Sequence, residues 1–269
     1  MTDLVPRLPP HAARTIHQFL RAHALGEGAD GLVLGLSGGI DSALTARLSV
    51  DALGPEHVIG VLLPDAEYPP ALLTETVDFG RALGIETRTI PIAPVEAAFR
   101  RALPEVTDRV SIGNTKARVR SAVLYAIARE RRRRVAGTGN KSELLLGYFT
   151  KYGDGGVDLL PIGDLYKTEV RALAAELELP RAVRERAPTA GLWDGQTDEA
   201  ELGATYDDLD RVLRGLEELR SEEEIATITG LPLPKVQEIA HRVIASRHKR
   251  RLPPVAKIGL RTVGIDWRE

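Results

Sequence analysis

Short apolar runs alternate with longer segments of helical period through the first half of the chain. The short runs, typical of buried β-strands, span residues 31–37, 57–64, 85–92 and 133–139. The longer segments, in which apolar residues recur at helical spacing, span residues 41–53, 70–83 and 115–131. A repeated β-α pattern of this kind predicts a parallel sheet with helices on both faces.

Beyond residue 165 the strand pattern stops. Helical patterns follow at residues 166–178, 198–215, 221–228 and 233–247. Because crossovers between parallel strands are right-handed, we expect an α/β fold: a doubly wound, Rossmann-like parallel sheet with a C-terminal helical flank. No proline- or glycine-rich linker divides the sequence, so residues 1–269 are expected to form a single domain.

Composition narrows the class of partner. The 269 residues include 36 Lys and Arg and 38 Asp and Glu, which gives a formal net charge of -2. General nucleic-acid binding depends on an excess of cations, so we expect a small-molecule partner and no nucleic acid. The sequence lacks an apolar run of membrane-spanning length and a signal-peptide pattern. We therefore expect no membrane partner and a cytoplasmic location.

The turn after the first predicted strand has the features of a phosphate-binding loop. In a doubly wound sheet this turn lies at the carboxyl edge and leads into the amino end of a helix, where anions bind. Small residues allow the backbone to approach phosphate closely, and two serine hydroxyls add donors. The residues predicted to contact ATP here are Gly35, Leu36, Ser37, Gly38, Gly39, Ile40, Asp41 and Ser42.

Asp41 distinguishes this loop from other phosphate-binding loops. The Walker loop ends in Gly-Lys-Ser/Thr, whereas Ile40 and Asp41 occupy the corresponding place here. A carboxylate beside a triphosphate repels it unless a divalent cation lies between them. We therefore predict that Asp41 binds magnesium. The alternative is that Asp41 only favours the start of a helix.

Several motifs carry a family resemblance. The segment SGGIDS at residues 37–42 resembles the SGGxDS signature of the PP-loop ATP pyrophosphatases, which implies an adenine nucleotide α-hydrolase-like fold and cleavage of ATP between its α- and β-phosphates. Other segments resemble the ammonia-dependent NAD synthetase family. They are GNTKARVR at residues 113–120 and the segments at residues 137–173, 187–210 and 247–254.

The resemblance implies a reaction and a set of partners. The reaction is the ATP-dependent amidation of deamido-NAD with ammonia through an NAD-adenylate intermediate, which gives NAD, AMP and pyrophosphate. The implied substrates are ATP, deamido-NAD and ammonia, and the implied cofactor is Mg²⁺. The resemblance also implies a homodimer in which the dinucleotide lies close to the subunit boundary.

A second set of residues is expected to complete the ATP site. Glu143 follows the fourth predicted strand at the same sheet edge as Asp41, so the two carboxylates can share a cation. Lys167 opens a predicted helix, where a cation disfavours the helix dipole, and this misfit suggests a phosphate contact. The resemblance assigns magnesium to Asp41 and Glu143, and ATP to Thr138, Lys167 and Thr189. Taken alone, Glu143 could be a solvated acid and Thr189 a turn hydroxyl.

The resemblance places the deamido-NAD contacts at Arg118, Lys151, Asp158, His248 and Lys249. Cations suit a ligand with a pyrophosphate and a carboxylate, although RHKRR alone would be typical of a solvated basic helix end. The turn-forming residues at 149–158 predict a mobile flap that excludes water. Asp158 is our candidate to accept a proton from the attacking nitrogen. The predicted catalytic residues are Asp41, Glu143, Lys167 and Asp158.

Other functions stay open at this point. A tRNA-modifying PP-loop enzyme would need a strongly basic face and commonly uses cysteines, and a non-catalytic nucleotide-binding module could share the fold. The chain has no cysteine. Since glutamine-dependent enzymes commonly use a cysteine nucleophile in a separate domain, and the motifs occupy nearly the whole chain, we expect free ammonia as the nitrogen source. Leu192 and Trp193 are expected to be exposed, as at an interface.

Overall fold

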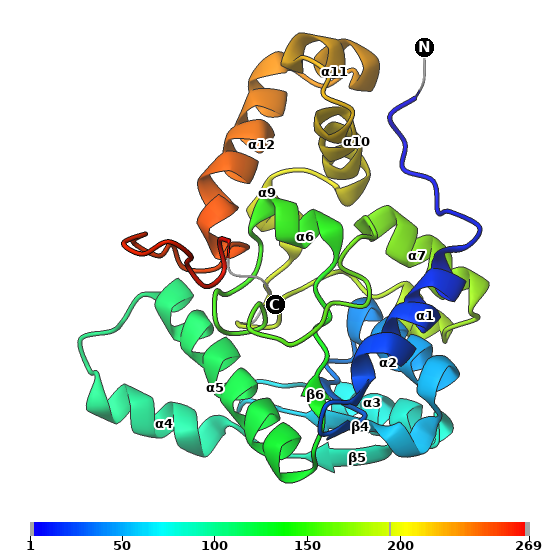
Figure 1. Cartoon of the computed structure of the whole chain (residues 1–269), viewed down its shortest axis with the longest axis vertical. Coiled ribbons are helices and arrows are strands. Elements are labelled where there is room, and N and C mark those ends of the chain that lie inside the picture. Colours follow the sequence, from blue (N-terminus) through cyan, green and yellow to red (C-terminus); the bar gives the residue numbers. More distant parts are fainter. Residues whose placement is uncertain (1–2, 194, 267–269) are drawn as a thin grey trace.

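The structure is a computed structural model that describes residues 3–193 and 195–266. A parallel sheet forms the base of the molecule in the view of Figure 1. Its strands are β3 (Leu32–Gly35), β4 (Val58–Leu62), β5 (Glu86–Thr89) and β6 (Arg134–Val135). They lie in the order β5-β4-β3-β6, and every neighbouring pair is parallel. This confirms the predicted parallel sheet, with strands shorter than the apolar runs.

Helices cover both faces of the sheet, as the sequence predicts. Leu32 and Leu34 in β3 pack in one core cluster with α1 (Ala12–Ala24) and α2 (Ile40–Leu53). Val33, which points to the opposite face, packs in a second cluster with residues of α5 (Arg109–Glu130). Alternate residues of one strand thus pack into two apolar cores, one on each face of the sheet. The sheet is therefore doubly wound.

The remaining elements follow in chain order. They are β1 (Leu25–Gly26), β2 (Ala29–Asp30), η1 (Pro55–His57), α3 (Pro70–Ala82), α4 (Ala93–Ala102), α6 (Lys141–Leu146), α7 (Lys167–Glu176), α8 (Arg181–Arg184), α9 (Asp198–Leu202), α10 (Tyr206–Glu217), α11 (Glu222–Thr229), α12 (Leu233–Ala245) and η2 (Ser246–Lys249). The sequence analysis did not predict α1, α4, α6, α8 or the small hairpin of β1 and β2.

Two helix boundaries differ from the prediction for local reasons. The helix expected at 115–131 begins earlier, at Arg109, because the Asp108 carboxylate caps it by accepting from the Ser111 N–H at 2.8 Å. The helix expected at 198–215 is divided into α9 and α10. Gly203, with φ +68°, ends α9 in a left-handed conformation that glycine adopts readily.

The C-terminal helical flank is confirmed and has its own apolar core. Residues of α10, α11 and α12 pack together with Leu146 of α6 and Tyr166, which precedes α7. Figure 1 shows these helices above the sheet, with α6 and α7 between them and α2. The single domain expected over residues 1–269 stays a prediction. No helix in the described part of the chain is both long and apolar enough to cross a membrane.

The order of the strands in the sheet determines where the candidate site lies. Strand β3 lies between β4 and β6, and the chain reaches these neighbours by crossovers on opposite faces. The carboxyl ends of β3 and β6 therefore flank the crevice at which ligands bind in open α/β sheets. The segments that leave these two ends carry SGGIDS and GTGNKSE.

Candidate active site

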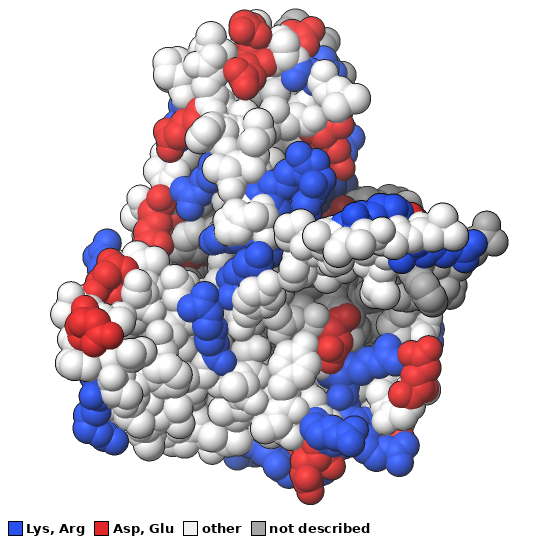
Figure 2. All heavy atoms as spheres, turned by 60° about the vertical axis from the view of Figure 1, so that its left-hand side comes forward, with Lys and Arg blue, Asp and Glu red and all other residues white. Residues whose placement is uncertain are grey.

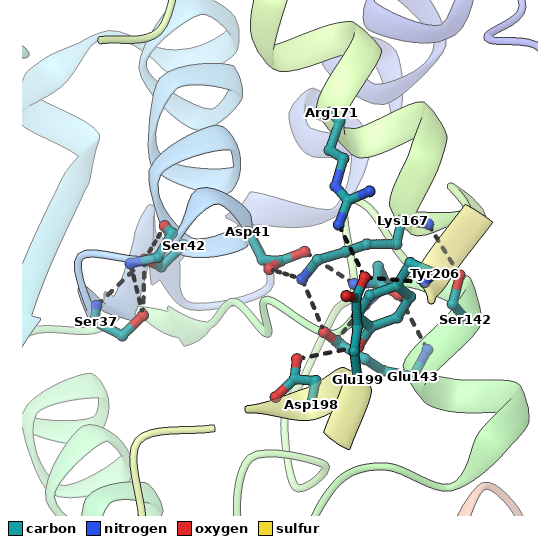
Figure 3. A network of polar contacts seen from close by, with 12 residues as sticks. Ser37, Asp41, Ser42, Ser142, Glu143, Lys167, Arg171, Asp198, Glu199 and Tyr206 are labelled. Atoms are coloured by element: carbon teal, nitrogen blue, oxygen red, sulfur yellow. Dashed lines mark hydrogen bonds and ion pairs between the residues drawn. The ribbon is translucent and has the colours of Figure 1, made fainter. Parts of the chain in front are cut away.

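The phosphate loop connects β3 to the start of α2. The Ser42 hydroxyl accepts from the Ser37 N–H at 3.2 Å and donates to the Gly39 carbonyl at 3.0 Å, which closes the loop on itself (Figure 3). Gly38 has φ +78°, and a Cβ there would approach Leu72 to 2.5 Å. No side chain caps α2, so the amino end of this helix can receive an anion.

Asp41, Glu143 and Lys167 meet beside this loop. The Lys167 ammonium lies 2.5 Å from Asp41 Oδ2 and 3.3 Å from Glu143 Oε1, so one cation bridges two carboxylates (Figure 3). The Lys167 side chain is 2% exposed, and the two carboxylates are 17% and 15% exposed. Asp41 thus forms one cluster with two residues that lie more than 100 positions later in the sequence, as the topology of the sheet predicts for Asp41 and Glu143.

Burial and the local charges oppose each other in this cluster. Burial raises the pKa of Glu143, the Lys167 ammonium lowers it, and the Asp41 carboxylate raises it again, with a net upward shift. For Lys167, burial lowers the pKa, but Asp41 and Glu143 outweigh this effect and raise it. Lys167 therefore stays charged, whereas burial, with a smaller contribution from the Asp41 charge, gives Glu143 a stronger proton affinity.

Asn140 connects the two carboxylates and was not singled out from the sequence. Its side chain accepts from the Glu143 N–H at 3.0 Å, and Glu143 Oε2 accepts from the Asn140 N–H at 3.1 Å, which forms a capping box at the start of α6. Its amide group also donates to Asp41 Oδ1 at 2.9 Å. The Asn-x-x-Glu spacing was the available signal for both α6 and this contact.

A cavity of about 920 Å³ opens above the phosphate loop. The predicted ligand-binding residues that line it are Gly35, Leu36, Ser37, Gly39, Ile40, Asp41, Ser42, Thr138, Glu143, Lys167, Thr189 and Lys249. Gly38 faces a smaller adjoining hollow. The cavity is of the size that encloses nucleotide-sized ligands. The structure therefore brings the predicted ATP residues together.

The other predicted dinucleotide residues lie elsewhere. Arg118 is exposed on α5 and donates to the Lys151 carbonyl at 3.3 Å. The Asp158 carboxylate accepts from the Val135 N–H at 2.7 Å and from the Tyr125 hydroxyl at 3.0 Å, which ties it to β6 and α5. These residues and the exposed His248 are not among those that line the cavity in the described chain. Their ligand contacts stay a prediction.

The segment 149–158 borders the cavity as a series of turns. The Thr150 hydroxyl donates to Asn114 Oδ1 at 2.7 Å, and the Thr150 N–H donates to Asp154 Oδ1 at 2.8 Å. Lys249 approaches the start of this segment, where its ammonium donates to the Gly147 and Phe149 carbonyls at 2.7 and 2.9 Å. These contacts are consistent with the predicted position of the flap at residues 149–158 beside the site. The mobility of this flap stays a prediction.

Leu192 and Trp193 form part of the cavity wall. Both side chains are half-buried, and the Arg109 guanidinium lies 4.9 Å from the centre of the Trp193 ring. The Leu192 carbonyl accepts from the buried Lys116 ammonium at 3.0 Å, and this lysine also pairs with Asp65 at 2.9 Å. The prediction that Leu192 and Trp193 are exposed is wrong, because α5 anchors their loop over the cavity.

A doubly wound parallel sheet, a phosphate loop at its switch point and paired carboxylates at the same edge define an α/β protein of the PP-loop class. The family model described as NAD synthase matches residues 12–253, and the chain belongs to this family of ligases. The family resemblance expected from the sequence motifs is confirmed.

Individual relatives agree with this assignment. The chain is 48% identical over 250 residues to an NH(3)-dependent NAD(+) synthetase from Methanosarcina acetivorans, with 92% of this chain and 98% of the relative covered. A structure of NMN synthetase from Francisella tularensis is similar with a TM-score of 0.82 and 34% identity, over 94% of this chain and 100% of that one. An NH3-dependent NAD synthetase from Campylobacter jejuni gives a TM-score of 0.77 and 33% identity, over 91% and 98%.

Proposed function

We propose that this chain is an ammonia-dependent NAD synthetase. ATP adenylates the nicotinate carboxylate of deamido-NAD with release of pyrophosphate, and ammonia then displaces AMP to form the amide. The observation that carries this proposal is the convergence of Asp41, Glu143 and Lys167 beside the phosphate loop, in a chain whose relatives include an NH(3)-dependent NAD(+) synthetase.

The proposed cofactor is Mg²⁺, held by Asp41 and Glu143. Their oxygens converge on a single position, which the Lys167 ammonium occupies. Within the described residues no three His, Asp or Glu side chains are grouped to hold a metal ion, so phosphate oxygens and water would supply the other ligands. The bound ion would reduce the negative charge on the α-phosphate and on the leaving pyrophosphate.

The side chains of this protein would contribute mainly positioning and charge. The Lys167 ammonium would contact a phosphate oxygen and so stabilise the charge on the leaving group, while Asp41 and Glu143 would hold the metal ion. The loop backbone and the amino end of α2 fix the phosphates, and the wall formed by Leu192 and Trp193 limits the access of water to an acyl-adenylate. Asp158 stays our candidate proton acceptor.

We further propose a homodimer in which the outer face of α5 contributes to the dinucleotide site. Val110, Arg118 and Tyr125 recur at intervals of eight and seven residues and therefore share one face of α5. Val110 is 51% exposed, and Phe99 in α4 is 45% exposed. Figure 2, in which this side of the molecule comes forward, shows a broad area with few charged side chains. A second subunit there would enclose Arg118, Lys151 and Asp158.

Sedimentation tests the dimer. The wild-type chain should sediment as a dimer at micromolar concentration, and Val110→Arg should shift it toward the monomer by placing an unpaired charge in the interface. A wild-type monomer at this concentration would overturn the proposal. The cytoplasmic location is likewise a proposal, and cell fractionation tests it.

The reaction is tested by NAD formation with purified protein, ATP, Mg²⁺ and deamido-NAD. Ammonium chloride should support turnover, and ammonium-free glutamine should not, because the chain has no cysteine to form the usual glutamyl intermediate. Comparable turnover with glutamine, in the absence of a copurified glutaminase, would contradict the proposal. No pyrophosphate release in the presence of deamido-NAD would favour a non-catalytic nucleotide-binding module.

The similarity to an NMN synthetase defines the competing substrate. The mononucleotide acid carries the same nicotinate carboxylate as deamido-NAD but lacks the adenylate half, so both could be adenylated by the same groups. The assay should therefore compare the two acids at equal concentration. We expect a higher kcat/KM for deamido-NAD; a preference for the mononucleotide would assign the chain the function of that relative.

A further inference from the structure

The end of the 187–210 segment carries a carboxylate that the proposed chemistry does not use. Asp210 lies in α10, four residues after Tyr206, so both side chains project from the same face of the helix. Asp210 is 0% exposed. Burial raises the pKa of its carboxyl group, and hydrogen bonds from Ser142 and Thr168 act in the opposite direction. A buried carboxylate is costly unless its oxygens are hydrogen-bonded, so its contacts indicate its role.

Asp210 joins the two helices that carry Glu143 and Lys167. Its Oδ1 accepts from the hydroxyl of Ser142, the residue before Glu143, at 2.5 Å. Its Oδ2 accepts from the N–H and the hydroxyl of Thr168, the residue after Lys167, both at 2.8 Å. The Ser142 oxygen in turn accepts from the Lys167 N–H at 2.9 Å. The Asp210 carboxylate is thus hydrogen-bonded to the sequence neighbours of both Glu143 and Lys167.

Tyr206 adds a contact from the same face of α10. Its hydroxyl donates to Asp198 at 3.1 Å, and its ring centre lies 5.2 Å from the Lys167 ammonium. Figure 3 shows this ring next to the ammonium, where Lys167 extends toward Asp41. Helix α10 therefore holds both ends of Lys167. The Tyr206 ring lies at the ammonium, and Asp210 reaches the Lys167 backbone N–H through the Ser142 hydroxyl.

Apolar packing does not define this arrangement by itself. Helix α6 has six residues, too few to be stable without tertiary contacts. The apolar contacts of the helical flank are not directional, whereas hydrogen bonds with fixed donors and acceptors limit how far the starts of α6 and α7 can rotate or slide. A displacement of about 1 Å at a reacting centre can cost about 10²-fold in rate.

We propose that Asp210 is a positioning residue that holds Glu143 and Lys167 in the geometry required for the metal and phosphate contacts. This inference rests on the proposed synthetase function. Asp210 is not among the residues that line the cavity, so it acts through Ser142 and Thr168. Its loss should impair adenylation and the use of magnesium, and should leave the binding of deamido-NAD and ammonia nearly unchanged.

The test compares Asp210→Asn with the wild-type chain. Asparagine keeps the size of the side chain but replaces one acceptor oxygen with an amide NH2 donor, so either Ser142 or Thr168 loses the acceptor that it has in Asp210. We expect kcat to fall about 10- to 100-fold, with a higher magnesium requirement. The KM values for deamido-NAD and ammonia should change by less than about twofold. Calorimetric titration with magnesium and a non-hydrolysable ATP analogue should show the same loss without turnover.

Thr229→Val provides the matched control. The Thr229 hydroxyl donates to the Ile225 carbonyl at 2.7 Å inside α11, so this variant should lower Tm but not kcat. Thr168→Val removes one donor to Asp210 and serves as a second test if Asp210→Asn does not fold; it should lower kcat more than Thr229→Val does. Wild-type kcat and magnesium use in the Asp210 or Thr168 variant would overturn the positioning role. A wild-type chain that makes no NAD would instead overturn the proposed function.

Discussion

The phosphate loop and the cluster of Asp41, Glu143 and Lys167 lie side by side but are built in different ways. The loop is made by consecutive residues, and its hydrogen bonds join Ser37, Gly39 and Ser42. The cluster joins side chains at positions 41, 143 and 167, and it depends on a capping residue and on a buried network from the helical flank. A local element keeps its form through its own backbone, whereas the cluster depends on the whole fold.

Removal of Lys167 should give the largest effect on the cluster. Lys167→Met leaves two partly buried carboxylates without their cation, which should destabilise the unliganded chain by about 3–5 kcal/mol at neutral pH. Added magnesium should restore part of this stability. Thermal unfolding with and without magnesium measures both effects. Lys141→Met is the control, because Lys141 pairs with the exposed Asp164 and Glu217; equal stability of the two variants would contradict the assigned role of Lys167.

Asp41→Asn should separate catalysis from stability. The substitution removes a proposed ligand for magnesium, and turnover should fall by about 10²-fold or more. Folding should hardly change, because Lys167 keeps Glu143 as its partner and the cluster loses its excess negative charge. Steady-state rates over a magnesium series, together with Tm, provide the measurement. Near-normal rates at limiting magnesium would show that Asp41 has another role.

Gly38→Ala should damage the phosphate loop alone. The φ of +78° costs a non-glycine residue about 1–2 kcal/mol, and the added Cβ would meet Leu72 and Thr76 at 2.5 and 2.7 Å. We expect a higher KM for ATP and an unchanged magnesium dependence once ATP is saturating. If the magnesium dependence changes as it does in Asp41→Asn, the loop and the cluster are not separate units.

Glu143→Gln should give the smallest effect, on the pH dependence of stability. The pKa of Glu143 is raised above its ordinary value of 4.5. Its contribution to folding is therefore fully present below about pH 4.5 and is lost as pH rises through the raised pKa. The metal-free variant, which keeps the capping box, should lose less stability than the wild type between pH 5 and 9. Urea unfolding measures this, and Gly38→Ala should keep the wild-type slope.

The same contrast explains what the sequence could predict. The phosphate loop was recognisable because its residues are contiguous, and Glu143 followed from the rule that parallel strands end at one edge. Asn140 could have been found from its spacing to Glu143. For Asp210 the sequence could show only its place on the apolar face of α10, at helical spacing from Tyr206 and Leu213; its contacts with Ser142 and Thr168 could not be predicted, because they depend on how α10 packs on α6 and α7.

The position of the Lys167 ammonium has a consequence for how the protein is made. In many small metal-binding domains the negatively charged ligands repel one another when no metal is bound, and the polypeptide folds only after it binds its ion. Here the chain supplies its own counter-ion between Asp41 and Glu143. A newly synthesised molecule can therefore complete its fold without a bound metal ion at these carboxylates. Folding of this chain would then not depend on the supply of a metal ion.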